Sequence, residues 1–212
     1  MKLQIALDLV TREKALSMVR DIHDVIDIVE IGTPMIIKEG VVPVKEMKEN
    51  FPRVTVLADL KIADGGYVEA KYAVDAGADI VTVLAIASDE TIKGARDAAH
   101  EAGREIYVDL LSVPDVVARA IELDLMGVDY IGVHTASDVQ GLGRTPYDEL
   151  EQIAKVVKHA KVAAAGGIHL GTIGKVKQLG ADVGIVGGAL TKAENLRKAV
   201  EDFQAIIKED NK

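Results

Sequence analysis

The chain has 212 residues, of which 49% are hydrophobic and 28% are charged, and its formal net charge of −9 argues against nucleic acids and anionic membranes as partners. No stretch approaches the roughly 20 apolar residues of a membrane-spanning helix, and Asp8 interrupts the N-terminal apolar run Leu3–Val10, so we expect neither a signal peptide nor a membrane segment. The absence of cysteine excludes disulfides, thiolate metal sites and cysteine nucleophiles, and is compatible with a cytoplasmic location.

Runs of residues that favour β-strands alternate with charged, amphipathic stretches along the whole chain. The predicted strands are Gln4–Leu9, Asp27–Gly32, Val54–Lys61, Ile80–Ile86, Glu105–Leu111, Tyr130–Thr135, Lys161–Gly167 and Val183–Leu190. The predicted helices between them include Thr11–His23, Gly65–Gly77, Ser88–Ala102 and Asp115–Leu125. Since no linker or low-complexity segment interrupts this alternation, we expect residues 1–212 to form a single domain.

Three connections between a predicted helix and the next strand share a pattern of glycine, small residue and aspartate, at 77–79, 127–129 and 180–182. Such repetition indicates equivalent turns in one layer. Eight strand–helix units in this length leave about 26 residues each, which suits a compact (β/α)8 barrel with parallel strands. The alternative is an open, doubly wound sheet, but Leu7–Val10 follows the first strand where that fold usually has Gly-x-Gly-x-x-Gly.

The segment Leu57–Gly66 carries three charged residues in an otherwise apolar run. In a strand, Asp59 and Lys61 would point to the same face, and Asp64 would fall just beyond the strand end. A buried carboxylate beside a buried ammonium is costly unless the charges pair or serve a ligand. Taken alone, the segment fits a structural ion pair about as well as a functional site.

Other predicted strands also place ionisable residues near their carboxyl ends, where barrel enzymes have their active sites. Asp59, Asp109 and His134 recur in steps that are multiples of 25 residues. Each residue alone has a structural explanation, such as an ion pair or a buried histidine. Together they favour a functional site, and the additional residues are Asp8 and Glu30 on the first two strands.

Glycine pairs end the last two predicted strands, at Gly166–Gly167 and Gly187–Gly188. Glycines allow backbone amides to approach an anion closely, and barrels often bind a substrate phosphate at this position. Ordinary turn glycines remain the alternative, although two adjacent pairs favour phosphate binding. The connection 135–146 is unusually long for this chain, so it is a candidate lid or binding loop, with a disordered surface segment as the alternative. Arg144 is the residue in it that we expect to contact the phosphate or to close the site.

These residues resemble the orotidine-5′-phosphate decarboxylase superfamily. The resemblance rests on Asp-x-Lys-x-x-Asp at 59–64, Asp8, the segment Val29–Pro34 and the two glycine pairs, and it extends through almost the whole chain. Glu30 and the segment His134–Gln140 are similar to the metal-dependent branch of that superfamily. Asp109, together with the lack of an arginine before Arg144, is similar to the synthases of this branch rather than its decarboxylases.

The resemblance implies addition of formaldehyde to D-ribulose 5-phosphate through an enediolate, with 3-keto-L-gulonate-6-phosphate decarboxylation and a non-catalytic sugar-phosphate-binding barrel as alternatives. It implies Mg²⁺, or Mn²⁺, held by Glu30 and Asp59. Its implied catalytic residues are Lys61, Asp64, His134 and Asp109, and its substrate-binding residues are Asp8, Gly166, Gly167, Gly187 and Gly188. The resemblance also implies a homodimer in which Asp64 reaches the partner's active site.

Overall fold

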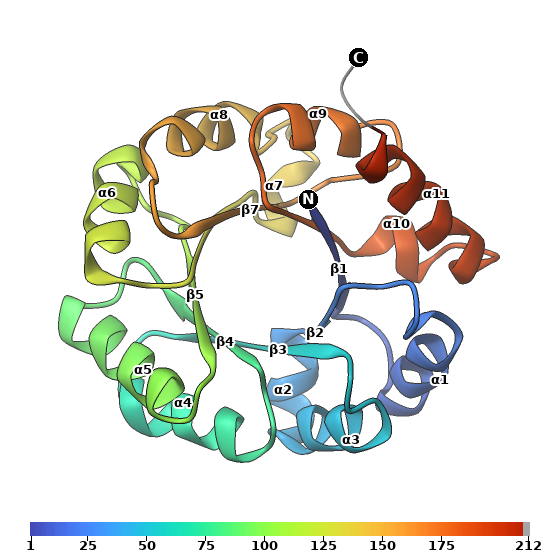
Figure 1. Ribbon diagram of the computed structural model, residues 1–212, viewed down its shortest axis with the longest axis horizontal. Coiled ribbons are helices and arrows are strands. Elements are labelled where there is room, and N and C mark those ends of the chain that lie inside the picture. The colour runs from blue at the N-terminus through green and yellow to red at the C-terminus, as the bar shows by residue number, and fades with distance from the viewer. Residues whose placement is uncertain (210–212) are drawn as a thin grey trace.

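The computed structural model describes residues 1–209. Eight parallel strands pair in chain order, and the eighth pairs with the first, so the sheet closes into a barrel surrounded by helices (Figure 1). The strands are β1 (Lys2–Leu7), β2 (Ile28–Ile31), β3 (Thr55–Ile62), β4 (Ile80–Leu84), β5 (Glu105–Asp109), β6 (Tyr130–His134), β7 (Lys161–Ala165) and β8 (Val183–Val186). The predicted (β/α)8 barrel is confirmed, and the doubly wound sheet is excluded.

The helices lie where the amphipathic pattern predicts them, with additional short helices in the connections. They are α1 (Arg12–Ile22), α2 (Thr33–Glu39), α3 (Val42–Asn50), α4 (Gly66–Asp75), α5 (Asp89–Glu101), α6 (Val116–Met126), α7 (Ser137–Gln140), α8 (Tyr147–Val156), α9 (Ile173–Gln178), α10 (Gly188–Thr191) and α11 (Leu196–Lys208). Thr11, Ser88 and Asp115 each cap a helix by accepting a hydrogen bond from the backbone amide three residues later. Within residues 1–209, no helix has the length and apolarity to cross a bilayer.

Most predicted strands extend too far at their carboxyl ends. The largest error concerns the last strand, which ends at Val186, whereas the following residues turn into α10. The backbone leaves the sheet at these points because the residues beyond each strand form the rim of the barrel. Glycine-rich, apolar sequence does not reveal where that departure occurs.

Two separate layers of apolar side chains stabilise the barrel. Alternate residues of β1, such as Leu3, Ile5 and Leu7, pack outward against the helices. A second, smaller cluster fills the barrel interior and comprises Ala6, Ile28, Leu57, Ile80, Tyr107, Tyr130, Ala163, Ala165, Val183 and Ile185. The interior is therefore packed, which leaves the barrel ends as the places where polar side chains gather.

The repeated aspartates act as clamps at the amino ends of the strands. Asp79, Asp129 and Asp182 each precede an even-numbered strand, and each accepts a hydrogen bond from a backbone amide of the strand before it, at 2.8–2.9 Å. The backbone N–H of each aspartate donates to the carbonyl of that same residue. Asp27 makes the same pair of bonds to Leu3, although its turn lacks the glycine. Every odd-numbered strand is thus clamped by the turn that leads into its successor.

We predict that Asp129→Ala lowers the free energy of unfolding by about 1–3 kcal/mol, because the buried amide of Ile106 loses its acceptor. Urea denaturation measures this change. His100→Ala is the matched control, since His100 contacts the Asp129 carboxylate from an exposed position and its loss leaves the clamp intact. Equal stabilities of Asp129→Ala and His100→Ala would contradict the clamp.

Candidate active site

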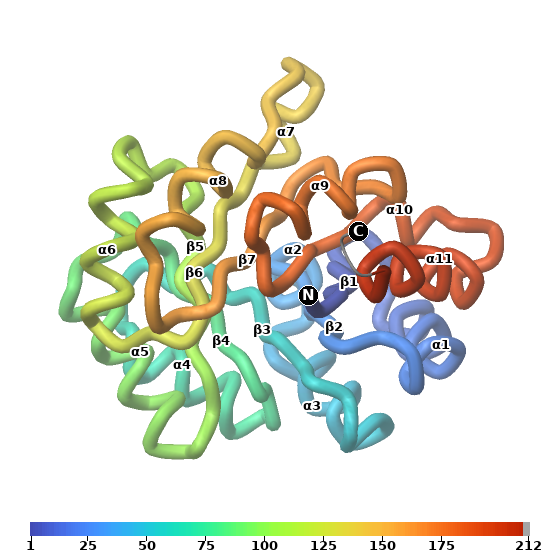
Figure 2. The backbone as a smooth tube through the Cα atoms, turned by 45° about the horizontal axis from the view of Figure 1, so that its top comes forward, coloured from blue at the N-terminus to red at the C-terminus, as the bar shows by residue number. Residues whose placement is uncertain are grey.

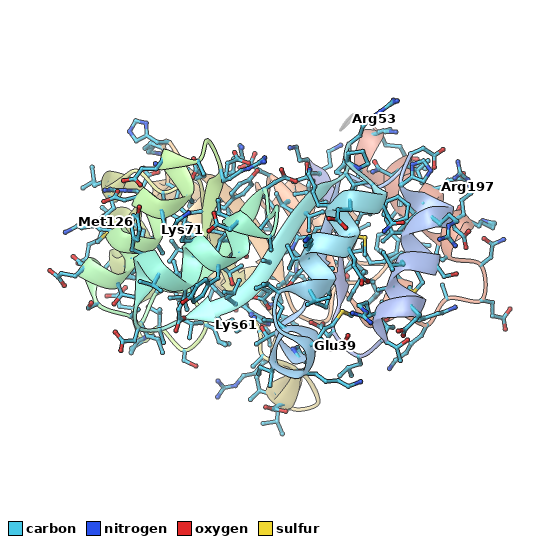
Figure 3. All side chains as sticks on the ribbon, turned by 90° about the horizontal axis from the view of Figure 1, so that it is seen from below. Glu39, Arg53, Lys61, Lys71, Met126 and Arg197 are labelled. Atoms are coloured by element: carbon cyan, nitrogen blue, oxygen red, sulfur yellow. The ribbon has the colours of Figure 1, made fainter. Side chains whose placement is uncertain are left out.

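Four ionisable side chains from three strands form a connected chain at the carboxyl ends of the strands. Lys61 Nζ lies 2.5 Å from Asp59 Oδ2 and 3.7 Å from Asp109 Oδ2. The other contact of Asp109 Oδ2 is His134 Nδ1, at 2.9 Å. Figure 3 places Lys61 at the opposite edge of the barrel from Arg53, which precedes β3. The structure therefore brings together Asp59, Lys61, Asp109 and His134, as their positions near the carboxyl ends of three strands suggested.

The Asp59 carboxylate is almost completely buried and accepts three side-chain hydrogen bonds. Lys61 Nζ and Thr33 Oγ1 donate to Oδ2, while Thr82 Oγ1 donates to Oδ1 at 2.8 Å. Burial opposes ionisation of this group, but the Lys61 charge and these hydrogen bonds outweigh it, so the pKa of Asp59 lies below its usual value. Asp59 is consequently a buried anion with a fixed orientation.

Lys61 has an unusual backbone conformation, with φ of 49° in the left-handed region. This conformation costs a residue with a Cβ roughly 1–2 kcal/mol. Lys61 lies within an irregularity of β3. The sequence predicted that regular alternation along the strand places Asp59 and Lys61 on one face, but the irregular backbone is what brings them together. Burial opposes the Lys61 charge, but Asp59 and Asp109 outweigh that effect and raise the pKa of Lys61. The ammonium is therefore held in its charged form.

Glu30 and Asp8 add two more acidic groups beside these connected side chains. Glu30 is buried, and its Oε2 accepts a hydrogen bond from Gln4 Nε2 at 2.7 Å. Burial, together with the negative charges of Asp59 and Asp8, raises the pKa of Glu30 well above its usual value. Burial and the Asp59 charge also raise the pKa of Asp8. Glu30, Asp8 and Asp59 are thus close enough to raise one another's cost of ionisation, while the Lys61 ammonium opposes this effect.

Glu30 and Asp59, the predicted metal ligands, suit a cation such as Mg²⁺ that takes few of its ligands from the protein. Glu30 and Asp59 supply hard oxygen atoms, and Mg²⁺ is commonly held by one or two carboxylates together with water and substrate. Within residues 1–209, no cluster of three or more histidine, cysteine, aspartate or glutamate side chains is arranged as a metal site. A divalent cation at Glu30 would offset the negative charges of Asp59 and Asp8, which contribute to its raised pKa.

The glycine pairs border the same rim. Gly166 and Gly167 have φ values of 107° and 67°, which favour glycine, and a Cβ on Gly166 would lie 2.5 Å from the Thr135 carbonyl oxygen. A Cβ on Gly187 would lie 3.8 Å from Asp8 Oδ2, so this pair adjoins the acidic cluster. Gly188 begins α10. The predicted phosphate-binding residues therefore lie next to the chain of charged groups.

Two of the predicted site residues, Asp64 and Arg144, lie apart from the charged residues of their own subunit. Asp64 is exposed just beyond β3, and its Oδ1 accepts a hydrogen bond from the Gly65 amide. Arg144 is exposed in the long connection after β6, from which α7 projects beyond the barrel (Figure 2). Neither side chain contacts Lys61 or the glycine pairs within the described residues.

Four neutral residues of the site were not predicted from the sequence. Gln4, Thr33 and Thr82 hydrogen-bond to Glu30 or Asp59, and Gln140 lies above Gly167 and donates to the Thr135 carbonyl at 3.0 Å. The signal for two of them was available, because Gln4 and Thr82 are polar residues at inward-facing positions of apolar strands. Thr33 and Gln140 lie in connections, where polar residues are ordinary.

Comparison with known proteins identifies the family. The orotidine 5′-phosphate decarboxylase / HUMPS family model matches residues 1–203. This chain belongs to that family.

Family members with specific names are similar over nearly the whole chain. The 3-hexulose-6-phosphate synthase of Bacillus subtilis is 47% identical, over 98% of this chain and 99% of its own length. The crystal structure of 3-hexulose-6-phosphate synthase from Salmonella typhimurium has a TM-score of 0.94 and 42% identity, with 98% of each chain covered. The 3-keto-L-gulonate-6-phosphate decarboxylase from Vibrio cholerae has a TM-score of 0.84 and 26% identity, with 97% of this chain and 96% of that chain covered. The superfamily resemblance seen in the sequence is confirmed.

We predict that Gly32→Ala lowers the free energy of unfolding by about 1–3 kcal/mol through overpacking at the site. A Cβ on Gly32 would lie 2.1 Å from Asp8 Oδ1 and 2.9 Å from Asp8 Cα, so the backbone that follows β1 would have to move. Gly141→Ala is the matched control, because nothing lies within 4 Å of its Cβ position and its φ of −62° suits alanine. Urea denaturation of both variants tests the prediction, which fails if Gly32→Ala is as stable as the control.

Proposed function

We propose that this protein is an aldehyde-lyase that joins formaldehyde and D-ribulose 5-phosphate to give D-arabino-3-hexulose 6-phosphate, in a reversible reaction. The synthases that are 42–47% identical over 98% of the chain support this assignment. The structural observation that carries it is the chain of contacts from Asp59 through Lys61 and Asp109 to His134, because it combines a fixed positive charge with a proton-transfer group.

His134 transfers the proton in this mechanism. Histidine is the side chain whose ordinary pKa lies nearest neutrality. The Asp109 carboxylate orients the imidazole through Nδ1, so the proton is exchanged at Nε2. His134 removes a proton from C1 of the sugar phosphate and leaves an enediolate. The C1 electron pair then forms the new bond to the carbonyl carbon of formaldehyde, whose C=O π pair moves to the oxygen. The resulting alkoxide takes the proton back from His134 Nε2, which returns the imidazole to its starting form.

Lys61 stabilises the negative charge that develops on the substrate oxygens. Its ammonium is fixed by Asp59 and Asp109 before substrate binds, so little reorganisation is needed during the reaction. Asp8, which directly follows β1, binds a substrate hydroxyl. The amides of Gly166, Gly167, Gly187 and Gly188 bind the phosphate group at the rim.

Glu30 and Asp59 are the residues that would hold Mg²⁺, or alternatively Mn²⁺. The ion would supply Lewis acidity and positive charge for the two oxygens of an enediolate. Gln4 on one ligand and Thr33 and Thr82 on the other keep both carboxylates oriented toward the site. This arrangement is the kind of support that metal ligands need from their neighbours.

We further propose that the protein acts as a cytoplasmic homodimer with shared active sites. The exposed position of Asp64 supports this, because a side chain that lies outside its own cluster can serve a neighbouring subunit. In the dimer, Asp64 reaches Lys61 of the partner subunit and helps to keep its ammonium charged.

The first test is consumption of formaldehyde by the purified protein with D-ribulose 5-phosphate and Mg²⁺, with and without EDTA. We expect consumption that depends on both the sugar phosphate and the metal. Release of CO₂ from 3-keto-L-gulonate 6-phosphate without formaldehyde consumption would move the function to the decarboxylase. Absence of both activities would favour a non-catalytic sugar-phosphate-binding barrel.

Replacing Lys61 by alanine should reduce kcat by about 100-fold or more, because the enediolate loses its preorganised positive charge. Steady-state assays of formaldehyde consumption measure this effect, and circular dichroism checks the fold. Lys155→Ala is the control, since this exposed lysine pairs with Glu151 on the outer helix α8 and should retain wild-type activity. Unchanged kcat in Lys61→Ala would remove Lys61 from the mechanism.

Mixing two inactive variants tests the shared site. Lys61→Ala and Asp64→Ala subunits, unfolded and refolded together in equal amounts, should recover about a quarter of the wild-type activity, because half of the dimers are mixed and each has one complete site. Each variant refolded alone is the control. No recovery, although mass spectrometry detects mixed dimers, would contradict the shared site.

A further inference from the structure

The irregularity in β3 lies opposite a single residue of β4. Ala58 pairs with Val81 and Ile62 with Val83, so residues 59–61 of β3 face only Thr82. In a regular parallel pair, each strand advances by the same number of residues. The two additional residues of β3 therefore leave the ladder, and they include the left-handed Lys61.

Thr82 replaces the interrupted ladder with its side chain. The Lys61 backbone N–H donates to Thr82 Oγ1 at 2.9 Å, and the Thr82 hydroxyl donates its own hydrogen to Asp59 Oδ1 at 2.8 Å. Thr82 is 3% exposed, so water is a poor substitute for either bond. One hydroxyl thus connects the backbone of Lys61 with the carboxylate that binds its ammonium.

The other groups around Lys61 do not hold its backbone. Among the described residues, the Thr33 hydroxyl donates to Asp59 alone, and its single hydrogen is shared between the carboxylate at 2.7 Å and the carbonyl oxygen at 2.8 Å. Asp59 and Asp109 contact the Lys61 ammonium at the end of a flexible side chain. Within residues 1–209, Thr82 is the group whose side chain binds both the Lys61 backbone and Asp59.

We infer that Thr82 is a positioning residue, whose hydroxyl holds the left-handed backbone at Lys61 and so delivers the ammonium to Asp59 and Asp109. This inference rests on the proposed function in assigning Lys61 a role in turnover. Without the hydroxyl, Lys61 would relax toward the extended conformation that residues with a Cβ prefer. The ammonium would then shift relative to the substrate, while the glycine pairs that bind the phosphate would remain in place.

Thr82→Val is the main test, because valine keeps the shape of threonine and removes the hydroxyl. We expect kcat for formaldehyde consumption to fall by about 100-fold through misplacement of Lys61, with little change in KM for the sugar phosphate. Thr82→Ser keeps the hydroxyl and should restore most of kcat. Thr55→Val makes the same substitution at the amino end of β3 and should retain wild-type kcat. If Thr82→Val does not fold, Thr82→Ala takes its place.

Wild-type kcat in Thr82→Val would overturn the inference, and so would an equal loss in Thr82→Ser, which would assign the effect to the methyl group. A crystal structure of Thr82→Val provides a readout that does not depend on activity. It should show Lys61 at negative φ, whereas an unchanged left-handed Lys61 would overturn the inference. An inactive wild-type protein would count against the proposed function alone, because the backbone conformation of Lys61 can still be compared between the two proteins.

Discussion

Ionised side chains lose their hydration inside a barrel, and the architecture of the candidate site depends on how that loss is offset. Three donors stabilise the Asp59 carboxylate, and two carboxylates stabilise the Lys61 ammonium. Glu30 receives one hydrogen bond, from Gln4, and faces two other acidic groups, so burial and repulsion raise its pKa. This imbalance is the physical support for the divalent cation that we propose, because a cation would relieve the repulsion that the protein itself leaves in place.

Hydrogen bonds at the two ends of the barrel have different roles: those at the amino ends fix the strand backbone, and those at the carboxyl ends position the side chains of the candidate site. At the amino ends, Asp27, Asp79, Asp129 and Asp182 hold the odd-numbered strands by paired hydrogen bonds to the backbone. At the carboxyl ends, side chains interact mainly with one another, and the strands finish in glycines and loops. Separating stability from chemistry allows the carboxyl rim to carry buried charge and a left-handed lysine while the opposite rim maintains the register of the strands.

The hydrogen bonds from neutral residues fix the positions of the charged groups more narrowly than the charged groups fix one another. Thr82 shows this most clearly, because one hydroxyl replaces a ladder bond and orients a carboxylate. Gln4 on β1 likewise orients a carboxylate, that of Glu30 on β2, through one hydrogen bond. Charged groups attract one another over several ångströms, whereas a hydroxyl or an amide acts only at hydrogen-bond distance, so such residues set the positions between which the charges act.

The alternation of strands and helices, the helix starts at Thr11 and Ser88, and the repeated turns with aspartate could be predicted from the sequence, because each depends on residues close together in the chain. The placement of ionisable residues near strand ends could also be predicted, since parallel strands bring their carboxyl ends together. The tertiary structure decided that β3 departs from its register, that Thr82 bridges Asp59 and Lys61, and that Asp64 is exposed beyond β3. These features depend on the register between strands and on the closure of the barrel, which pairs residues far apart in the chain and leaves no periodic signal in the sequence.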